Sequence, residues 1–191
     1  MRLFAALDIP EDVRESLGTL VAKLRGVCKD ARWARIEGFH ITLKFIGEVS
    51  PQKTMDIKAA LGKVQFPAPI AIQFGGLGFF PNSRRPRVLW AGVKAGPALA
   101  TLASSVEDEL NLLGIAREDR PFSPHLTLAR IDSPNKLGAL HSAIDALGAY
   151  GTPEFGKSIA KEFHLYQSVL KPGGAEYTRL ATFSFAGRKA E

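Results

Sequence analysis

Cysteine is nearly absent from this chain of 191 residues, which contains only Cys28. A single cysteine excludes a disulfide framework within the chain, and such usage is typical of proteins in a reducing compartment. Cys28 lies in the segment RGVCKD, where no metal-ligand or redox partner stands at a recognised spacing. We therefore interpret it as a small packing residue and expect a cytoplasmic protein.

The sequence also lacks any apolar run that approaches the roughly 20 residues of a membrane span. Its first residues, MRLFAALDIPED, reach Asp8 and Pro10 too early to form a signal peptide. We therefore expect no membrane association. Hydrophobic residues make up 46% of the chain and charged residues 23%, which is ordinary for a globular protein.

Acidic residues are fewer than basic ones, and the formal net charge is +6 with a pI near 9.6. This balance fits a polyanionic partner, but many basic proteins bind nothing anionic, so charge alone excludes little. The length allows one substantial domain or two small lobes that share a core. No linker or low-complexity segment interrupts the chain, and we expect a single domain over residues 1–191.

Hydrophobic periodicity predicts strands and helices that alternate along the chain. Strands are expected at residues 2–9, 39–49, 68–80, 85–94, 122–131, 160–171 and 177–186, and helices at residues 10–26, 51–64, 96–114 and 135–148. This mixture indicates an α+β or an α/β fold, and the order of the elements does not decide between the two.

Histidine is scarce as well, yet two of the four histidines begin the same short pattern. The segments are HITL at residues 40–43 and HLTL at residues 125–128. Four histidines and eight threonines in random order would give roughly 0.17 His-x-Thr pairs. One copy would most simply be a half-buried strand with a satisfied core histidine. Two copies favour a duplicated half-site, in which two lobes face each other.

Side chains alternate along a strand, so the histidine and the threonine of each motif share one face. In the strand at residues 39–49, strict alternation also places Lys44 on the face of His40 and Thr42, and Phe45 on the opposite, buried face. The remaining histidines, His141 and His164, have no threonine at the same spacing. We interpret these two as structural or solvated.

Two such platforms could bind a metal, bind an anion or perform acid–base chemistry. A metal site usually needs a third protein ligand, and neither motif offers a carboxylate on its polar face. A threonine hydroxyl is a good hydrogen-bond donor to a phosphate oxygen. Of two imidazoles, one can accept a proton from water while the other protonates a leaving oxygen. The pattern therefore predicts phosphodiester cleavage with no metal and no cofactor.

The chain resembles the RNA 2′,3′-cyclic phosphodiesterases, also called 2′-5′ RNA ligases, of the two-histidine (HXTX) phosphoesterase superfamily. The resemblance is carried by RLFAALDIP, by HITL with the following LKFIGEV, and by GLGFFPNSRRPRVLWAGV, FSPHLTLAR and LYQSVLKPGGAEYTRL. It covers nearly the whole chain. It implies an α+β fold of two pseudo-symmetric lobes, each an antiparallel sheet with helices packed outside, and an active-site groove between them.

The same resemblance implies hydrolysis of RNA 2′,3′-cyclic phosphate ends to 2′-phosphomonoesters, with an ATP-independent 2′-5′ ligation of RNA as a second activity. His40 would be the proton donor, His125 the proton acceptor, and Thr42 and Thr127 the phosphate-binding residues. The partners would be RNA with a 2′,3′-cyclic phosphate or tRNA-like fragments, and the protein would be a monomer. By sequence alone the two histidines are nearly equivalent, so their roles depend on the resemblance.

Three further residues are candidate RNA contacts. Arg130 follows the second motif at an offset that faces away from His125 in a regular strand, but it reaches the phosphate if the strand bends. Arg84 lies in a basic loop that could contact the RNA backbone or simply be solvated. Phe80 opens that loop and could stack on a base or pack in the core.

Two other functions fit the same residues. One is a non-catalytic module that binds RNA ends or nucleotides, although arginine or lysine would bind a phosphate as well as histidine does. The other is a phosphodiesterase for small cyclic nucleotide phosphates, which the basic loop opposes only slightly. Identification of the phosphate position in the products of a panel of cyclic-phosphate substrates would distinguish these functions.

The motif chemistry predicts that hydrolysis of a 2′,3′-cyclic phosphate survives EDTA, because the two platforms carry no carboxylate or thiol that would complete a metal site. The rate is measured before and after chelation and dialysis. Loss of turnover that added zinc or manganese restores would contradict a metal-free reaction.

Overall fold

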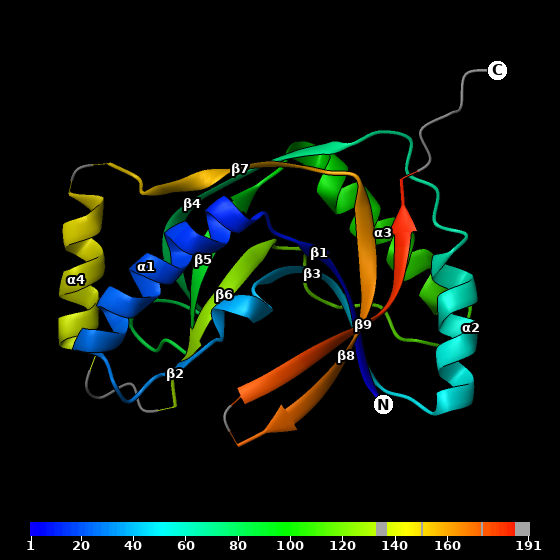
Figure 1. Cartoon of the computed structure of the whole chain (residues 1–191), viewed down its shortest axis with the longest axis horizontal. Helices are drawn as coiled ribbons and strands as arrows, with labels where there is room; N and C mark the ends of the chain where they lie inside the picture. The colour runs from blue at the N-terminus through cyan, green and yellow to red at the C-terminus, as the bar shows by residue number, and fades with distance from the viewer. Residues whose placement is uncertain (133–136, 150, 173, 186–191) are drawn as a thin grey trace.

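The computed structural model of the protein describes residues 1–132, 137–149, 151–172 and 174–185 (Figure 1). Its strands are β1 (Arg2–Asp8), β2 (Arg32–Trp33), β3 (His40–Glu48), β4 (Ile70–Phe80), β5 (Val88–Lys94), β6 (His125–Arg130), β7 (Glu154–Ala160), β8 (Glu162–Lys171) and β9 (Gly174–Ser184). Its helices are α1 (Glu11–Val27), α2 (Pro51–Leu61), α3 (Gly96–Asn111), α4 (Gly138–Gly148) and a short 3-10 helix, η1 (Ile36–Gly38).

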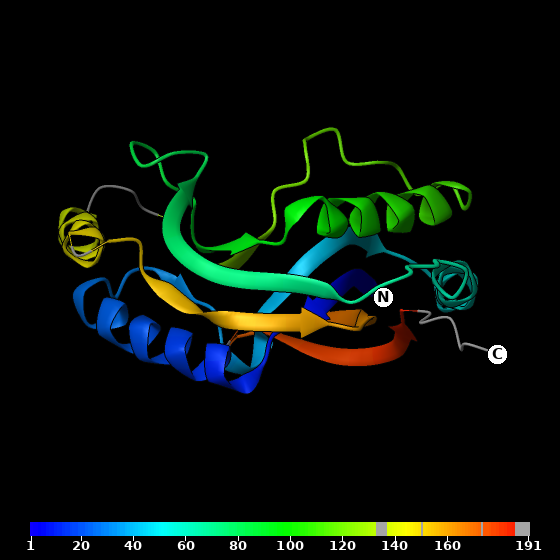
Figure 2. The same cartoon turned by 90° about the horizontal axis from the view of Figure 1, so that it is seen from above.

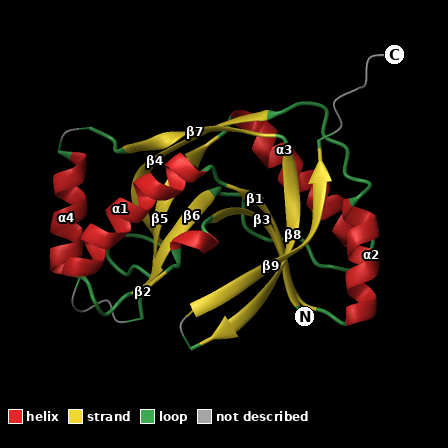
Figure 3. Ribbon diagram, in the orientation of Figure 1, coloured by secondary structure: helices red, strands yellow, loops and turns green. Residues whose placement is uncertain are grey.

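The strands form two antiparallel sheets (Figure 3). The first sheet has the order β3-β1-β8-β9 and the second has the order β2-β6-β5-β4-β7. The helices lie on the outside of the sheets, as two perpendicular views show (Figures 1 and 2). Because the paired strands are antiparallel, the fold is α+β rather than α/β, and the predicted fold class is confirmed.

Each sheet takes strands from both halves of the sequence. The C-terminal hairpin β8–β9 pairs with β1, and the short β2 pairs with β6. Neither sheet can therefore be completed by one half of the chain. The buried apolar residues of both sheets and of the helices form one core cluster. Because each sheet contains strands from both halves of the chain, the motif strands β3 and β6 and the β8–β9 hairpin lie close together.

The predicted helices are present, and their apolar stripes point into this core. In α1 the stripe of Val13, Leu17 and Leu24 is buried, and acidic residues occupy the first turn, as the helix dipole favours. In α2 the side chain of Ser50 caps the helix by accepting a hydrogen bond from the backbone N–H of Lys53. Within the described residues, no helix is long and apolar enough to cross a membrane.

Some elements escaped the sequence analysis. The strand β2 has two residues and gives no periodic signal. The strand β7 was missed because it lies at a sheet edge with few buried side chains, and it contains Gly156 with a φ of 132°. The strand β9 begins three residues earlier than expected. Residues 135 and 136 of the predicted fourth helix, and residue 186 of the last predicted strand, lie outside the described residues.

Both motif strands contain a β-bulge directly after the threonine. Along β3 the partner in β1 changes from Ala6 opposite Thr42 to Ala5 opposite Lys44, so that one residue is skipped. The same change follows Thr127 in β6. Trp90 of β5 lies opposite Thr127, and the adjacent Leu89 lies opposite Ala129, so that one residue of β6 is skipped. An extra residue reverses the alternation of side chains beyond it.

The first bulge overturns the expected placement of two residues. Lys44 does not share the face of His40, because its side chain points into the protein and is only 7% exposed. Phe45 is not buried but 56% exposed, on the side where Lys44 was expected. Strict alternation was the wrong assumption, and the bulge is the physical reason.

Lys44 is held in the interior by an ion pair. Its Nζ donates to Oε1 of Glu107 on α3 at 2.5 Å, and the backbone N–H of Glu118 donates to the same oxygen at 2.9 Å. Partial burial would raise the pKa of Glu107, but these two hydrogen bonds and the positive charges of Lys44 and Arg117 together outweigh it, and the pKa lies below its usual value. The pair therefore ties the bulged segment of β3 to α3.

Lys44→Met should lower the free energy of unfolding by about 3 kcal/mol, because it leaves a mostly buried carboxylate without its cation. The double variant Lys44→Met/Glu107→Gln removes that charge, keeps an acceptor for Glu118, and should recover most of the loss. Urea denaturation gives the free energy of unfolding of the unaltered protein, of Lys44→Met and of the double variant. The folded pKa of Glu107 is depressed, so the ion pair contributes above the usual carboxyl pKa and its contribution is lost as the pH falls through the folded value. Equal stability of Lys44→Met and the unaltered protein at pH 7 would contradict this role.

Candidate active site

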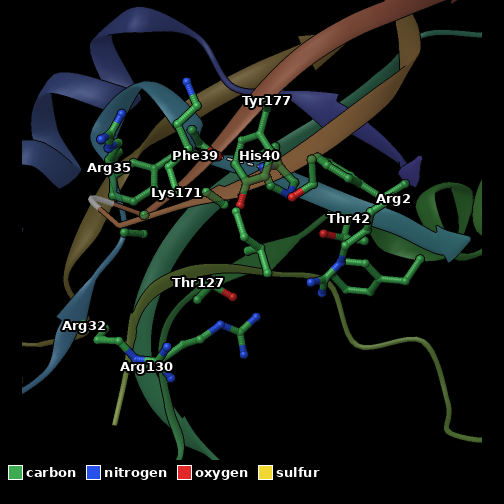
Figure 4. Close-up of a pocket in the computed structure, with 18 of the residues that line it drawn as sticks. Arg2, Arg32, Arg35, Phe39, His40, Thr42, Thr127, Arg130, Lys171 and Tyr177 are labelled. Carbon is green, nitrogen blue, oxygen red and sulfur yellow. Dashed lines mark hydrogen bonds between the residues drawn. The ribbon is translucent and has the colours of Figure 1, made fainter. Parts of the chain in front are cut away.

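The two His-x-Thr motifs line one groove of about 550 Å³ (Figure 4). His40 and Thr42 project into it from β3 of the first sheet, and His125 and Thr127 from β6 of the second. These motif residues are half-buried, as expected for side chains on the wall of a groove. The structure therefore brings together four residues that the sequence analysis selected from two segments, residues 40–43 and 125–128, that are far apart in the chain.

Both imidazole rings are oriented by the same kind of hydrogen bond. Nδ1 of His40 lies 2.7 Å from the carbonyl oxygen of Gly38, and Nδ1 of His125 lies 2.8 Å from that of Ser123. A carbonyl oxygen only accepts, so Nδ1 carries a hydrogen and donates it in each ring. In each ring Nε2 is then the nitrogen left to accept or donate a proton in the groove.

Aromatic rings fix the two histidines further. His40 packs at 4.6 Å from the ring of Phe4 and edge-on at 5.1 Å from Tyr177 of the C-terminal hairpin. The ring of His125 meets Phe80 edge-on at 4.9 Å. Phe80, a candidate base-stacking residue, thus contacts a motif histidine, although it is not part of the groove wall.

The electrostatic environment of His40 favours its neutral form. Burial lowers the pKa of His40, and the hydrogen bond to Gly38 and the negative charge of Asp8 offset this only in part. The charges of His125 and Arg14 lower it further. In the free protein, His40 is therefore readily available as a neutral imidazole near pH 7.

The threonine hydroxyls are available to a ligand. Within the described part of the chain, the hydroxyls of Thr42 and Thr127 make no hydrogen bond to the protein. None of the described residues that line the groove is a carboxylate or a cysteine. Across residues 1–132, 137–149, 151–172 and 174–185, no cluster of three or more metal-ligating side chains is present. The donor set of hydroxyls, imidazoles and cations suits an anion such as a phosphate.

The second bulge decides the position of Arg130. The consecutive residues Leu128 and Ala129 are both buried. Arg130 then returns to the face of Thr127 and lines the groove. Its charge and that of Arg2 both act on the hydroxyl of Tyr177, whose pKa burial nevertheless raises. Arg130 thus adds positive charge to the groove wall beside Thr127.

Phe45 occupies the same position after the first bulge that Arg130 occupies after the second, and it also lines the groove. The sequence analysis missed it because alternation assigned it to the core. An exposed aromatic ring on a groove wall offers a stacking face to a nucleobase.

Arg84 lies outside the groove. Its loop is shaped by the side chain of Asn82, whose Oδ1 accepts hydrogen bonds from the backbone N–H groups of Arg84 and Arg85. His141 and His164 also lie outside the groove wall, and His164 is buried with Nδ1 at 3.0 Å from the hydroxyl of Thr182. Cys28 is a free, buried thiol, in agreement with a packing role.

Comparison with known proteins gives one consistent family. The family model described as LigT like phosphoesterase matches residues 7–90 and 93–177. A curated RNA 2′,3′-cyclic phosphodiesterase of Archaeoglobus fulgidus is 39% identical over 183 residues, covering 96% of this chain and 99% of the relative. A protein of the same name from Methanocaldococcus jannaschii is 35% identical over 180 residues, covering 93% and 96%.

Solved structures agree with these matches. TT0787 of Thermus thermophilus superimposes with a TM-score of 0.81 at 32% identity, covering 98% of this chain and 100% of that chain. The structure of E. coli LigT complexed with 3′-AMP gives a TM-score of 0.75 at 28% identity, covering 96% and 97%.

Thr42→Ala and Thr127→Ala should each slow hydrolysis of a cyclic phosphate roughly tenfold or more, because each removes a hydrogen bond to a charged oxygen worth about 1.5–3 kcal/mol. Steady-state kinetics on a 2′,3′-cyclic nucleotide measures the effect, with circular dichroism to verify the fold. Thr42→Ser and Thr127→Ser keep the hydroxyl and are the matched controls, which should retain most of the rate. Full activity of both alanine variants would mean that the threonines serve only as strand residues.

Proposed function

The chain belongs to the LigT-like phosphoesterases, and we propose that it hydrolyses 2′,3′-cyclic phosphate ends of RNA to 2′-phosphomonoesters by acid–base catalysis between two histidines. The observation that carries this proposal is the meeting of the two His-x-Thr motifs in one groove, each with Nδ1 hydrogen-bonded to a carbonyl. The names of the curated relatives support the reaction, and they cover nearly the whole chain.

His125 is the proton acceptor and His40 the proton donor in this proposal. Neutral His125 takes a proton from water through Nε2 as the water oxygen attacks phosphorus. The bond from phosphorus to the ribose 3′ oxygen breaks, and Nε2–H of His40 protonates that oxygen. The phosphate stays on the 2′ oxygen, and one proton has passed from water to His125 and one from His40 to the product.

The lowered pKa of His40 is compatible with a donor role once substrate is bound. An anionic phosphate beside an imidazole favours the charged form and therefore opposes the effect of burial. Binding of the cyclic phosphate thus helps to protonate the donor. The rate is expected to show a bell-shaped dependence on pH, because one imidazole must be charged and the other neutral.

The hydroxyls of Thr42 and Thr127, with the guanidinium of Arg130, surround the non-bridging oxygens in this arrangement. They stabilise the negative charge that develops on the phosphate as water attacks. No cofactor and no metal ion is required by this set of residues, since proton transfer is supplied by the histidines and charge stabilisation by the hydroxyls and the cation. Arg84 and Phe80 remain proposals as RNA contacts.

An RNA 5′-hydroxyl in place of water gives a second reaction with the same residues. Attack of that hydroxyl on the cyclic phosphate forms a 2′-5′ phosphodiester and releases the 3′ oxygen. No ATP is consumed, because the cyclic diester itself is the activated group. We propose this ligation as a minor activity of a monomer that acts in the cytoplasm on RNA or tRNA-like fragments with cyclic ends.

The proposed reaction is tested by the position of the phosphate in the products. The protein is offered mononucleotides and oligonucleotides with 2′,3′-cyclic phosphates, and 2′-phosphomonoesters are the expected products. Formation of 3′-phosphomonoesters would reverse the direction of attack, and tight binding without turnover would favour a non-catalytic module.

A substrate with sulfur in place of the 3′ leaving oxygen separates the two histidines, because a thiolate leaves without a proton. His40→Ala should lose activity on the ordinary substrate and be largely rescued by the 3′-thio substrate. His125→Ala should be inactive on both. Rates of the two variants on both substrates are compared with those of the unaltered protein. The opposite pattern of rescue would exchange the two roles, and no rescue in either variant would contradict acid catalysis of leaving-group departure by a histidine.

A further inference from the structure

We propose that the groove continues from the catalytic histidines into a second binding site, which holds the phosphodiesters on the 5′ side of the cyclic end. The site is a cationic track formed by Arg32, Arg35 and Lys171, and it makes oligonucleotides better substrates than mononucleotides. This inference rests on the proposed function and specifies its substrate class.

The cationic track begins beside the second motif strand. Arg32 lies on β2 directly opposite Arg130 on β6, in adjacent hydrogen-bonded strands. Like charges in this arrangement disfavour strand pairing. Asp132 compensates Arg32 through a bidentate pair, in which both contacts are 2.7 Å. The guanidinium-bearing residues Arg32 and Arg130 are thus neighbours on the groove wall, where a bound polyanion would reduce the repulsion between their charges.

The cationic track continues to the tip of the C-terminal hairpin. Arg35 and Lys171 share the carboxylate of Glu176, with distances of 3.4 Å to Oε1 and 2.6 Å to Oε2. The track residues come from two segments, β2 with its following loop and the β8–β9 hairpin, yet all three line the same groove as the motifs. Figure 4 shows them on the side of the groove away from Thr42 and Arg2.

The ion pairs of the cationic track are easily exchanged for RNA phosphates. The cationic side chains are between 44% and 69% exposed, and exposed ion pairs contribute little to stability. A phosphodiester can therefore displace Asp132 or Glu176 at small cost. Arginine forks suit phosphate oxygens, and lysine adds a mobile point charge.

The chemistry of the substrate sets the direction of the strand. A cyclic 2′,3′-phosphate ends the RNA chain, so further nucleotides can extend only on the 5′ side. Apart from Arg130 beside the second motif, the cationic side chains that line the groove are Arg2 and the three residues of the cationic track. The upstream phosphodiesters therefore run along β2 toward the hairpin. Trp33, also on the groove wall, lies within this path and offers an apolar face to a base.

The test compares adenosine 2′,3′-cyclic phosphate with a dinucleotide and a trinucleotide that end in the same group. Because several cations of the cationic track act together on the upstream phosphates, the ratio of kcat/KM for the trinucleotide to that for the mononucleotide should be roughly tenfold or more. Neutral methylphosphonates at the upstream linkages should abolish most of this gain. A ratio near one, or equal rates with phosphodiester and methylphosphonate, would overturn the cationic track.

Variants then test whether the gain in kcat/KM with the trinucleotide depends on the residues of the cationic track. The triple variant Arg32→Gln/Arg35→Gln/Lys171→Gln should lose most of the ratio, whereas Lys23→Gln, which changes an exposed basic residue of α1 outside the groove wall, should keep it. The ratio is compared within each protein, so a loss shared by long and short substrates does not affect it. An unchanged ratio in the triple variant would exclude the track residues.

Failure of the proposed function gives a different result. If no cyclic phosphate is cleaved, the hydrolysis proposal is wrong, and the cationic track is still tested by binding of a fluorescent trinucleotide with a 2′-phosphate end. The triple variant should bind it about tenfold more weakly than the unaltered protein or Lys23→Gln, as expected for lost phosphate contacts. Equal affinities would overturn the cationic track whatever the kinetics show.

Discussion

Two β-bulges, one after each motif threonine, are the constraint on which the groove depends. Before each bulge, alternation places the histidine and the threonine on the groove wall. After it, the reversed alternation turns Phe45 and Arg130 to the same wall, while Lys44 enters the interior. A regular strand would have left the groove with neither the ring nor the guanidinium. The bulges thus widen each two-residue platform into a three-residue surface.

The two half-sites are alike in hydrogen bonding and different in environment. Each histidine uses a carbonyl two residues before it to hold Nδ1, which makes the two rings equivalent in tautomer. His40, however, packs against Phe4 and against Tyr177 of the C-terminal hairpin, and burial lowers its pKa. This packing favours the neutral form of His40, which is opposite to the protonated form that the proposed donor needs. In the proposed reaction the anionic substrate therefore has to supply the unlike protonation of the two histidines, and the scaffold alone does not.

The motif residues and the mixture of strands and helices could be predicted from the sequence because their signals are local, whereas the choice of α+β over α/β depended on the family resemblance. A doubled His-x-Thr pattern is visible without coordinates, and strong periodicity marks most strands and all four helices. Phe45, Lys44 and the track residue Arg32 could not be placed, since their positions depend on bulges and on a strand of two residues. These features are set by pairing between distant segments, and no local pattern records them.

The C-terminal hairpin connects the proposed RNA-binding track to the proposed catalytic site. The hairpin β8–β9 belongs to the sheet of the first motif, yet its tip reaches the groove end that β2 forms beside the second motif. One element therefore carries both Tyr177, against His40, and Lys171, in the cationic track. A displacement of the hairpin would alter the packing of His40 and the position of a track cation together. Because the same strands hold both, the proposed recognition of upstream RNA is mechanically linked to the orientation of the proposed proton donor.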